Sequence, residues 1–165
     1  MSGLDDWAEL DPEHWLVLVT DDEPAAADRA HVLRGRGPFV AIVQGRRMRT
    51  GERMHHELAA AMQFPSYYGE NSNAFFDCIR DLSWLGDVGL VLLVTDASQV
   101  LRNDEYGPET FWSALVDARE AWRHPVEQHF GRSEPAPYTV VLQDSQAALN
   151  RLGGASESLS RALGR

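Results

Sequence analysis

The chain has little of several features on which other protein classes depend. Its single cysteine, Cys78, excludes an internal disulfide, and because it contains no lysine, all 15 of its basic residues are arginines. No apolar run is long enough to cross a bilayer. Residues 1–10 are acidic and lack the basic start and apolar stretch of a secretory signal. These absences predict a cytoplasmic protein that makes no membrane contact.

Basic charge is scarce relative to acidic charge, and this bears on the partner. The 15 arginines are outnumbered by 25 acidic residues, and the formal net charge is -10. Nucleic-acid affinity depends on Lys and Arg displacing counterions from phosphates, so direct nucleic-acid binding is disfavoured. A basic protein partner is favoured because complementary charge speeds encounter. Solubility alone explains the acidity equally well, so the charge does not decide between these interpretations.

The hydrophobic pattern alternates between two periods along the chain. Compact apolar runs predict strands at residues 14–20, 39–43, 88–94 and 138–142. Helical spacing predicts helices at residues 25–33, 50–63 and 72–82, another starting near Pro108, and one or two short helices in 145–165 broken at Gly153 and Gly154. The run 39–43 is continuously apolar, which predicts a strand buried on both faces. Alternating strands and amphipathic helices are typical of an α/β domain with a mostly parallel sheet.

The helix at 72–82 has two distinct faces. Positions advance by about 100° per residue. With Phe75 at the centre, the buried face is predicted to hold Phe75, Cys78, Ile79 and Leu82, and the opposite face Asn73, Asp77, Arg80 and Asp81, with Phe76 on the shoulder. An aromatic ring beside polar groups suits a protein-binding surface. A solvated face whose phenylalanine covers a nearby loop gives the same pattern, so spacing leaves both interpretations open.

The segment before this helix, residues 64–71, is an aromatic loop. Tyr67 and Tyr68 are adjacent and are followed by Gly69. We expect at least one tyrosine to pack in the core, whereas an exposed one would suit an interface because tyrosine offers large area at low entropic cost. Gly69 is expected to adopt a backbone conformation that other residues resist.

No pattern in the chain indicates catalysis. His55-His56-Glu57 resembles half of a metalloprotease motif, but Ala60 stands where the second histidine belongs. No Walker loop, G-x-S-x-G elbow or G-x-G-x-x-G turn is present. Cys78 is expected to be buried and inert, and the arginine cluster at 46–49 is interpreted as a solvated loop. We therefore expect no enzymatic activity, no metal and no cofactor.

Residues 65–78 carry a family resemblance. They read Pro-Ser-Tyr-Tyr-Gly-Glu-Asn-Ser-Asn-Ala-Phe-Phe-Asp-Cys, and this run resembles the barstar family, whose archetype is the intracellular inhibitor of the secreted ribonuclease barnase. The resemblance implies a small parallel sheet flanked by helices over residues 38–144. An N-terminal extension with one strand (1–37) and a C-terminal helical extension (145–165) lie outside it. The resemblance further implies a protein partner, a basic nuclease, bound by a chain that is monomeric when free.

The resemblance also implies which residues bind the partner. The family's inhibitors plug the nuclease active site with this loop and helix, using carboxylates that mimic RNA phosphates. Carried over by position, the binding residues are Tyr67, Gly69, Asn71, Asn73, Phe76, Asp77, Arg80 and Asp117. Among them, Asp77 takes the place of the central inhibitory aspartate and Phe76 that of a helix tryptophan. Asp117 matches a peripheral acidic contact on a later helix.

Three departures from the family pattern concern the target. Asn73 replaces a second helix aspartate, Arg80 replaces a small polar residue, and Leu82 stands where the archetype has another tryptophan. The acidic face therefore has one carboxylate fewer and one cation more. The alternative function is an interaction or immunity module on the same scaffold, whose partner is not a barnase-like ribonuclease.

Overall fold

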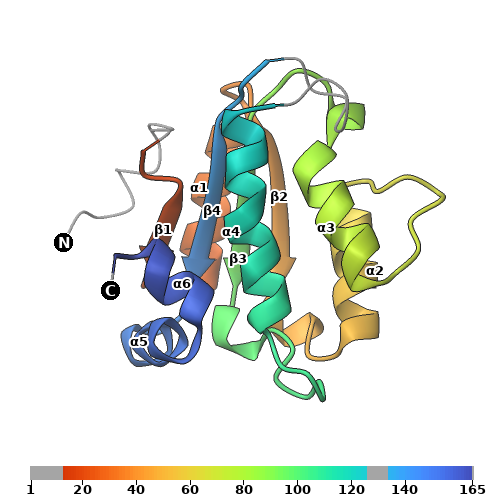
Figure 1. Cartoon of the computed structure of the whole chain (residues 1–165). Helices are drawn as coiled ribbons and strands as arrows, with labels where there is room; N and C mark the ends of the chain where they lie inside the picture. The colour runs from red at the N-terminus through yellow and green to blue at the C-terminus, as the bar shows by residue number, and fades with distance from the viewer. Residues whose placement is uncertain (1–12, 126–133, 165) are drawn as a thin grey trace.

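The computed structural model describes residues 13–125 and 134–164, and Figure 1 shows them as a sheet covered by helices. The elements in chain order are β1 (Leu16–Val19), α1 (Glu23–Arg34), β2 (Phe39–Gln44), α2 (Gly51–Ala61), α3 (Ser72–Asp81), β3 (Leu90–Thr95), α4 (Glu109–Arg123), β4 (Tyr138–Gln143), α5 (Gln146–Ala155) and α6 (Glu157–Ala162). Within these residues the strands form one parallel sheet in the order β1-β4-β3-β2. This confirms the predicted α/β fold with its added N-terminal strand and C-terminal helices.

Helices cover both faces of the sheet (Figure 1). On one face, Ala30 and Leu33 of α1 pack in a cluster with Val91 and Leu93 of β3. On the other face, α2, α3 and α4 enclose the larger apolar core. Successive side chains of a strand point to opposite faces, so the central strand β3, covered on both sides, buries all of its residues.

The two edge strands are less covered than the central pair. β2 lies at one edge and leaves Phe39 and Ile42 only partly buried. The prediction that 39–43 is buried on both faces is therefore wrong in part, because an edge strand has a neighbour on one side only. β1 forms the other edge, and its pairing with β4 runs from Leu16 opposite Val140 onward.

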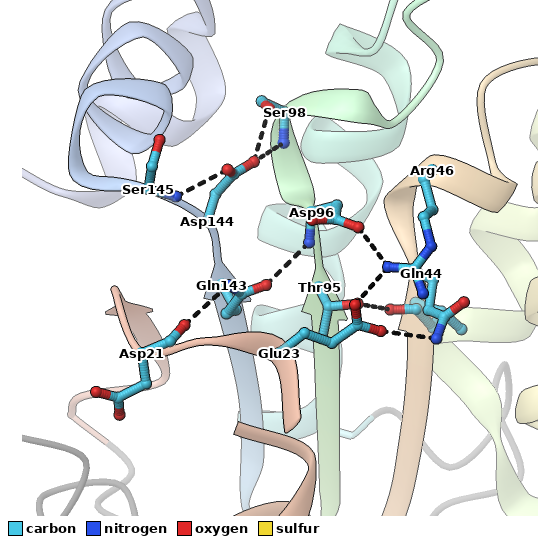
Figure 2. Close-up of polar contacts among 11 residues, drawn as sticks. Asp21, Glu23, Gln44, Arg46, Thr95, Asp96, Ser98, Gln143, Asp144 and Ser145 are labelled. Atoms are coloured by element: carbon cyan, nitrogen blue, oxygen red, sulfur yellow. Dashed lines mark hydrogen bonds and ion pairs between the residues drawn. The ribbon is translucent and has the colours of Figure 1, made fainter. Parts of the chain in front are cut away.

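The carboxyl ends of the strands are joined by polar contacts, which we call the carboxyl-end network (Figure 2). Arg46, which follows β2, forms ion pairs with Glu23 in the first turn of α1 and with Asp96 after β3, the latter at 2.6 Å. Gln143 of β4 donates to the backbone carbonyl of Asp21 at 2.9 Å and accepts from the backbone N–H of Asp96 at 3.1 Å. Arg46 is exposed, as the interpretation of a solvated loop expects, but it is also paired with carboxylates of two neighbouring segments.

The C-terminal helices meet at Ser156 and not at the glycine pair. Gly153 and Gly154 lie inside α5. Glu109 of α4 accepts hydrogen bonds from the hydroxyl of Ser156 at 2.6 Å and from the backbone N–H of Ser158 at 2.9 Å. A carboxylate at the start of a helix satisfies N–H groups that have no partner within the helix. The break therefore follows the capped start of α6, and the glycines only weaken α5.

Candidate functional site

Helix α3 starts at a cap supplied by the loop before it. The side chain of Asn71 accepts a hydrogen bond from the backbone N–H of Ala74 at 2.9 Å, the usual contact of an N-cap asparagine. The same side chain donates to the carbonyl of Gly69 at 3.2 Å. One residue therefore fixes both the start of the helix and the end of the loop.

The apolar face of α3 sets the rotation of the helix about its axis. Phe75, Cys78, Ile79 and Leu82 are buried, as the spacing predicts. The ring of Phe75 stacks on Phe111 of α4, with the two centroids 5.7 Å apart. Since this face is held against α4, the opposite face of α3 is held toward solvent.

The outward side of α3 carries two polar residues one turn apart, Asn73 and Asp77, and both are exposed. In the described part of the chain, neither side chain makes a hydrogen bond or ion pair. Residues four apart on a helix are neighbours, so the amide and the carboxylate lie side by side. Their hydrogen-bonding capacity is available to a partner.

Two other residues of this side are engaged within the chain. The guanidinium carbon of Arg80 lies 4.7 Å from the ring centre of Phe76, a cation–π contact. Asp81, which spacing places on the polar side, accepts a hydrogen bond from the backbone N–H of Ser83 at 3.1 Å and is only partly exposed. Below, the α3 face means Asn73, Phe76, Asp77 and Arg80.

The two loop tyrosines have opposite environments. Tyr68 is partly buried, its ring packs edge-on against Phe64 with centroids 4.7 Å apart, and its hydroxyl hydrogen-bonds Nδ1 of His55. Tyr67 is 79% exposed. The expectation that one tyrosine packs in the core is met by Tyr68, which leaves Tyr67 as the exposed aromatic residue of the loop.

The left-handed residue of the loop is Glu70, with a φ of 50°, and not Gly69. The prediction for the backbone of Gly69 is wrong, since the left-handed conformation falls one residue later, at Glu70, whose carboxylate lies 2.8 Å from Nε2 of His56 in α2. Glycine suits position 69 for a different reason: a Cβ there would lie 3.0 Å from the side-chain nitrogen of Asn71. A larger residue would push against the cap of α3.

Burial shapes the titration of the groups beneath the loop. It lowers the pKa of His55, which favours the neutral imidazole, and it raises the pKa of Tyr68. Burial is also the main reason that the pKa of Cys78 rises to about 11, and the carboxylates of Asp81 and Asp77 add to it. A buried thiol with so high a pKa is a poor nucleophile at neutral pH, in line with its predicted role as packing.

Several residues that hold the loop in place were not predicted from the sequence to do so. His55 and His56 tie the loop to α2, and the indole N–H of Trp84 donates to the carbonyl of Met62 at 3.0 Å beneath it. No local period links a histidine to a loop residue more than ten positions later, so only the fold reveals these contacts. Asp117 lies exposed on α4, the helix packed beside α3.

Signals of other functions are few. Among residues 13–125 and 134–164, no group of three His, Cys, Asp or Glu side chains could hold a metal ion. In the same ranges, no helix combines the length and apolar character needed to span a membrane.

Comparison with known proteins identifies the family of this chain. Residues 39–133 match the family model described as "Barstar (barnase inhibitor)". A protein of Bacillus subtilis (strain 168) named "Putative ribonuclease inhibitor YrdF" is 34% identical over 76 residues, which cover 46% of this chain and 71% of that protein. The family match begins at β2 and includes the whole loop, α3 and α4, whereas β1, α1, β4, α5 and α6 lie outside it. The chain therefore belongs to the barstar family.

Proposed function

We propose that this protein inhibits a ribonuclease by covering the enzyme's basic active site with the α3 face and the loop of residues 64–71. The observation that carries the proposal is Asp77, an exposed carboxylate without a partner in the described chain. It stands on a helix whose other side is locked in the core. A group held in place before binding loses little conformational entropy on association. The family description and the name of the Bacillus relative support the same function.

In this proposal, Asp77 supplies the negative charge that an RNA phosphate would bring to the active site. Hydrogen bonds from cationic donors to a carboxylate are roughly twice as strong as neutral ones. Tyr67, 79% exposed, adds aromatic area beside the charge. Asn73 adds hydrogen bonds, and the stacked Phe76 ring forms the apolar rim.

The remaining residues of the proposed site position the loop or add a contact at its edge. Gly69 and Asn71 hold the loop against the start of α3, so they set where Tyr67 stands. Asp117 on the neighbouring helix adds a peripheral acidic contact. We assign inhibition to residues 38–144 and a stabilising role to the extensions 1–37 and 145–165. The protein acts in the cytoplasm, as a monomer, without metal, cofactor or catalytic step.

The target is proposed to differ from barnase. The α3 face holds Asn73 where the family has a carboxylate, and it holds the cation Arg80 where the family has a small polar group. Mismatched charge at a desolvated interface costs affinity and separates related inhibitors from one another's targets. The cognate nuclease should therefore place an acidic or polar group opposite Arg80. If no nuclease is bound at all, the scaffold serves as an interaction module.

The test is affinity capture from the native host, with the full chain as bait and Asp77→Asn as the paired bait. A ribonuclease that the first bait captures and the second does not, and whose RNA cleavage stops when the full chain is added, supports the proposal. Capture of equal amounts by both baits, or a captured ribonuclease that stays active in the complex, contradicts it. The absence of any captured ribonuclease also contradicts it.

A further inference from the structure

A cleft of about 390 Å³ opens beside the start of α3, where the first turns of α2 and α4 meet the loop that precedes α4. Figure 1 shows these three helices starting at the same end of the molecule, the end at which the strands finish. Asn71 and Ser72 line the cleft and also begin α3. The cleft is therefore continuous with the loop and helix of the proposed binding site.

Tyr106 stands at this cleft and is 84% exposed. It is the most exposed of the large apolar side chains in the described residues; the others are Tyr67 (79%) and Val32 (59%). Exposure of an apolar ring to water is unfavourable. At a protein interface, a tyrosine contributes a large contact area at a low cost in conformational entropy. Tyr67 belongs to the loop that ends at Asn71, and Tyr106 lines the cleft that Asn71 and Ser72 also line.

The loop that carries Tyr106 is held by hydrogen bonds within the loop and to the segment that follows β2. The backbone N–H of Tyr106 donates to the carboxylate of Asp104 at 3.1 Å, and the N–H of Leu101 donates to the carbonyl of Met48 at 2.7 Å. Gly107 follows with a left-handed φ of 69° that favours glycine. A fixed loop presents the ring without a large entropic cost on binding.

Asp104 gives the cleft its charge. Its second carboxylate oxygen accepts from the backbone N–H of Gly51, the first residue of α2, at 2.9 Å. These two internal bonds use about half of the roughly four hydrogen bonds that a carboxylate can accept. Asp104 and Asn71 accept hydrogen bonds from the first N–H groups of α2 and α3, and among the described residues Asp104 is the acidic side chain that lines the cleft.

We propose that this cleft receives an arginine side chain of the partner, an inference that rests on the proposed function. The guanidinium would bind Asp104 and stack on Tyr106, while its aliphatic stem covers the apolar floor. That floor is formed by Met54, Phe75, Leu101 and Phe111. Arginine fits better than lysine because its planar group binds a carboxylate in two places and stacks on rings. Under the proposed function the partner is a basic protein, and its charge is complementary to the net charge of -10 that this chain carries.

The test uses a small probe and no ribonuclease, so it fails or succeeds independently of the proposed function. N-acetyl-arginine methylamide is titrated into the isotope-labelled full chain by NMR, with N-acetyl-leucine methylamide as the paired probe. We expect saturable millimolar binding of the arginine probe, with shifts at Tyr106, Asn71 and Thr110, and weaker binding of the leucine probe. No saturable shift, shifts elsewhere, or equal binding of both probes would overturn the proposal.

Variants sharpen the same titration. Tyr106→Ser should weaken the arginine probe about two- to fivefold, the loss of a surface cation–π contact. Tyr106→Phe should retain binding, and Val32→Ser, a matched change at an exposed apolar residue of α1, should leave it unchanged. Equal binding by Tyr106→Ser and the full chain would overturn the assignment. Once a ribonuclease is captured, Tyr106→Ser should weaken the complex by a similar factor; an unchanged complex would show that the cleft is not part of the interface.

Discussion

The α3 face and the carboxyl-end network are both polar regions built from neighbouring elements, but their polar groups are used differently. In the network, Arg46 pairs with Glu23 and Asp96, and Gln143 joins two strands (Figure 2). On α3, Asp77 has no partner in the described residues. A polar cluster alone therefore does not mark a functional site. An exposed charge that the fold holds in place and leaves unpaired is the stronger signal.

The largest expected effect comes from removing Asp21 and Glu23 of the network together with β1 and α1. A chain that starts at Arg36 lacks Val19 and Leu33, whose burial is worth roughly 3–6 kcal/mol in total. It also exposes the sheet face that α1 covers. Since a domain is stable by only about 5–15 kcal/mol, we expect partial or complete unfolding, measured by circular dichroism and thermal melting. A melting temperature equal to that of the full chain would show that this region is a dispensable arm.

On the α3 face, a single charge should dominate binding. Asp77→Asn is expected to weaken the complex with the captured ribonuclease by about 2–5 kcal/mol. This is the general range for loss of one partner of a buried charge pair, and measurements on the barnase–barstar complex are among those that define it. Calorimetric titration measures it. Asp28→Asn, an exposed aspartate on α1 outside the face, is the matched control and should bind normally. Affinity unchanged within error for Asp77→Asn would remove this residue from the interface.

The charges at Asn73 and Arg80 are expected to decide whether the α3 face inhibits barnase. The full chain should inhibit barnase weakly or not at all at micromolar concentration. Asn73→Asp combined with Arg80→Thr restores the family's charge pattern and should improve inhibition by about 1.5–3 kcal/mol, the value of a hydrogen bond to a charged group. Tight inhibition of barnase by the unmodified chain would contradict the argument, as would a double variant no better than its parent.

The carboxyl-end network should make the stability of the fold depend on pH in the acidic range. The hydrogen bond from Arg46 is the main cause that lowers the pKa of Glu23, and burial opposes it. A carboxyl whose folded pKa lies below its ordinary value of 4.5 stabilises the fold fully above that value and loses this contribution as the pH falls through the folded pKa. Melting temperatures measured on both sides of that pH should fall less steeply for Glu23→Gln than for the full chain. Parallel curves would mean that Glu23 does not contribute.

The smallest effect is expected at Cys78. Its pKa is raised to about 11 by burial, so a thiol reagent should modify the native protein far more slowly than the unfolded chain. Absorbance measurements with an aromatic disulfide reagent, with and without denaturant, compare the two rates. Equal rates would mean that the apolar side of α3 opens readily, which would weaken the view of a rigid binding helix.

Most of the fold follows from periodicity. The two faces of α3 were predictable because Phe75, Cys78 and Ile79 recur at helical spacing. The central strands were predictable because their apolar residues form compact runs. The errors have tertiary causes. Glu70 takes the left-handed conformation beside His56, which is remote in sequence. Arg46 is paired because α1 and β3 bring carboxylates to it, and no local pattern records that.

The site was predictable in part. The amphipathic pattern separates Asp77 from the core, but spacing alone could not tell a binding face from a solvated one. The cation–π contact between Arg80 and Phe76 was not predicted, although the two residues are four apart. Tyr106 gave no signal, because an isolated tyrosine in a loop is equally compatible with core or surface. Exposure and partnering, which decide these cases, depend on the whole fold.

The central claim is tested most directly by measuring two quantities on two variants: the free energy of unfolding and the affinity for the captured ribonuclease, each for Asp77→Asn and Glu23→Gln. The account predicts a crossover. Asp77→Asn should lose affinity and keep its stability, because its carboxylate has no partner among residues 13–125 and 134–164. Glu23→Gln should keep its affinity and lose about 1 kcal/mol of stability, because its carboxylate accepts from Gln44 and pairs with Arg46. An Asp77→Asn variant that is destabilised but binds normally would contradict the account.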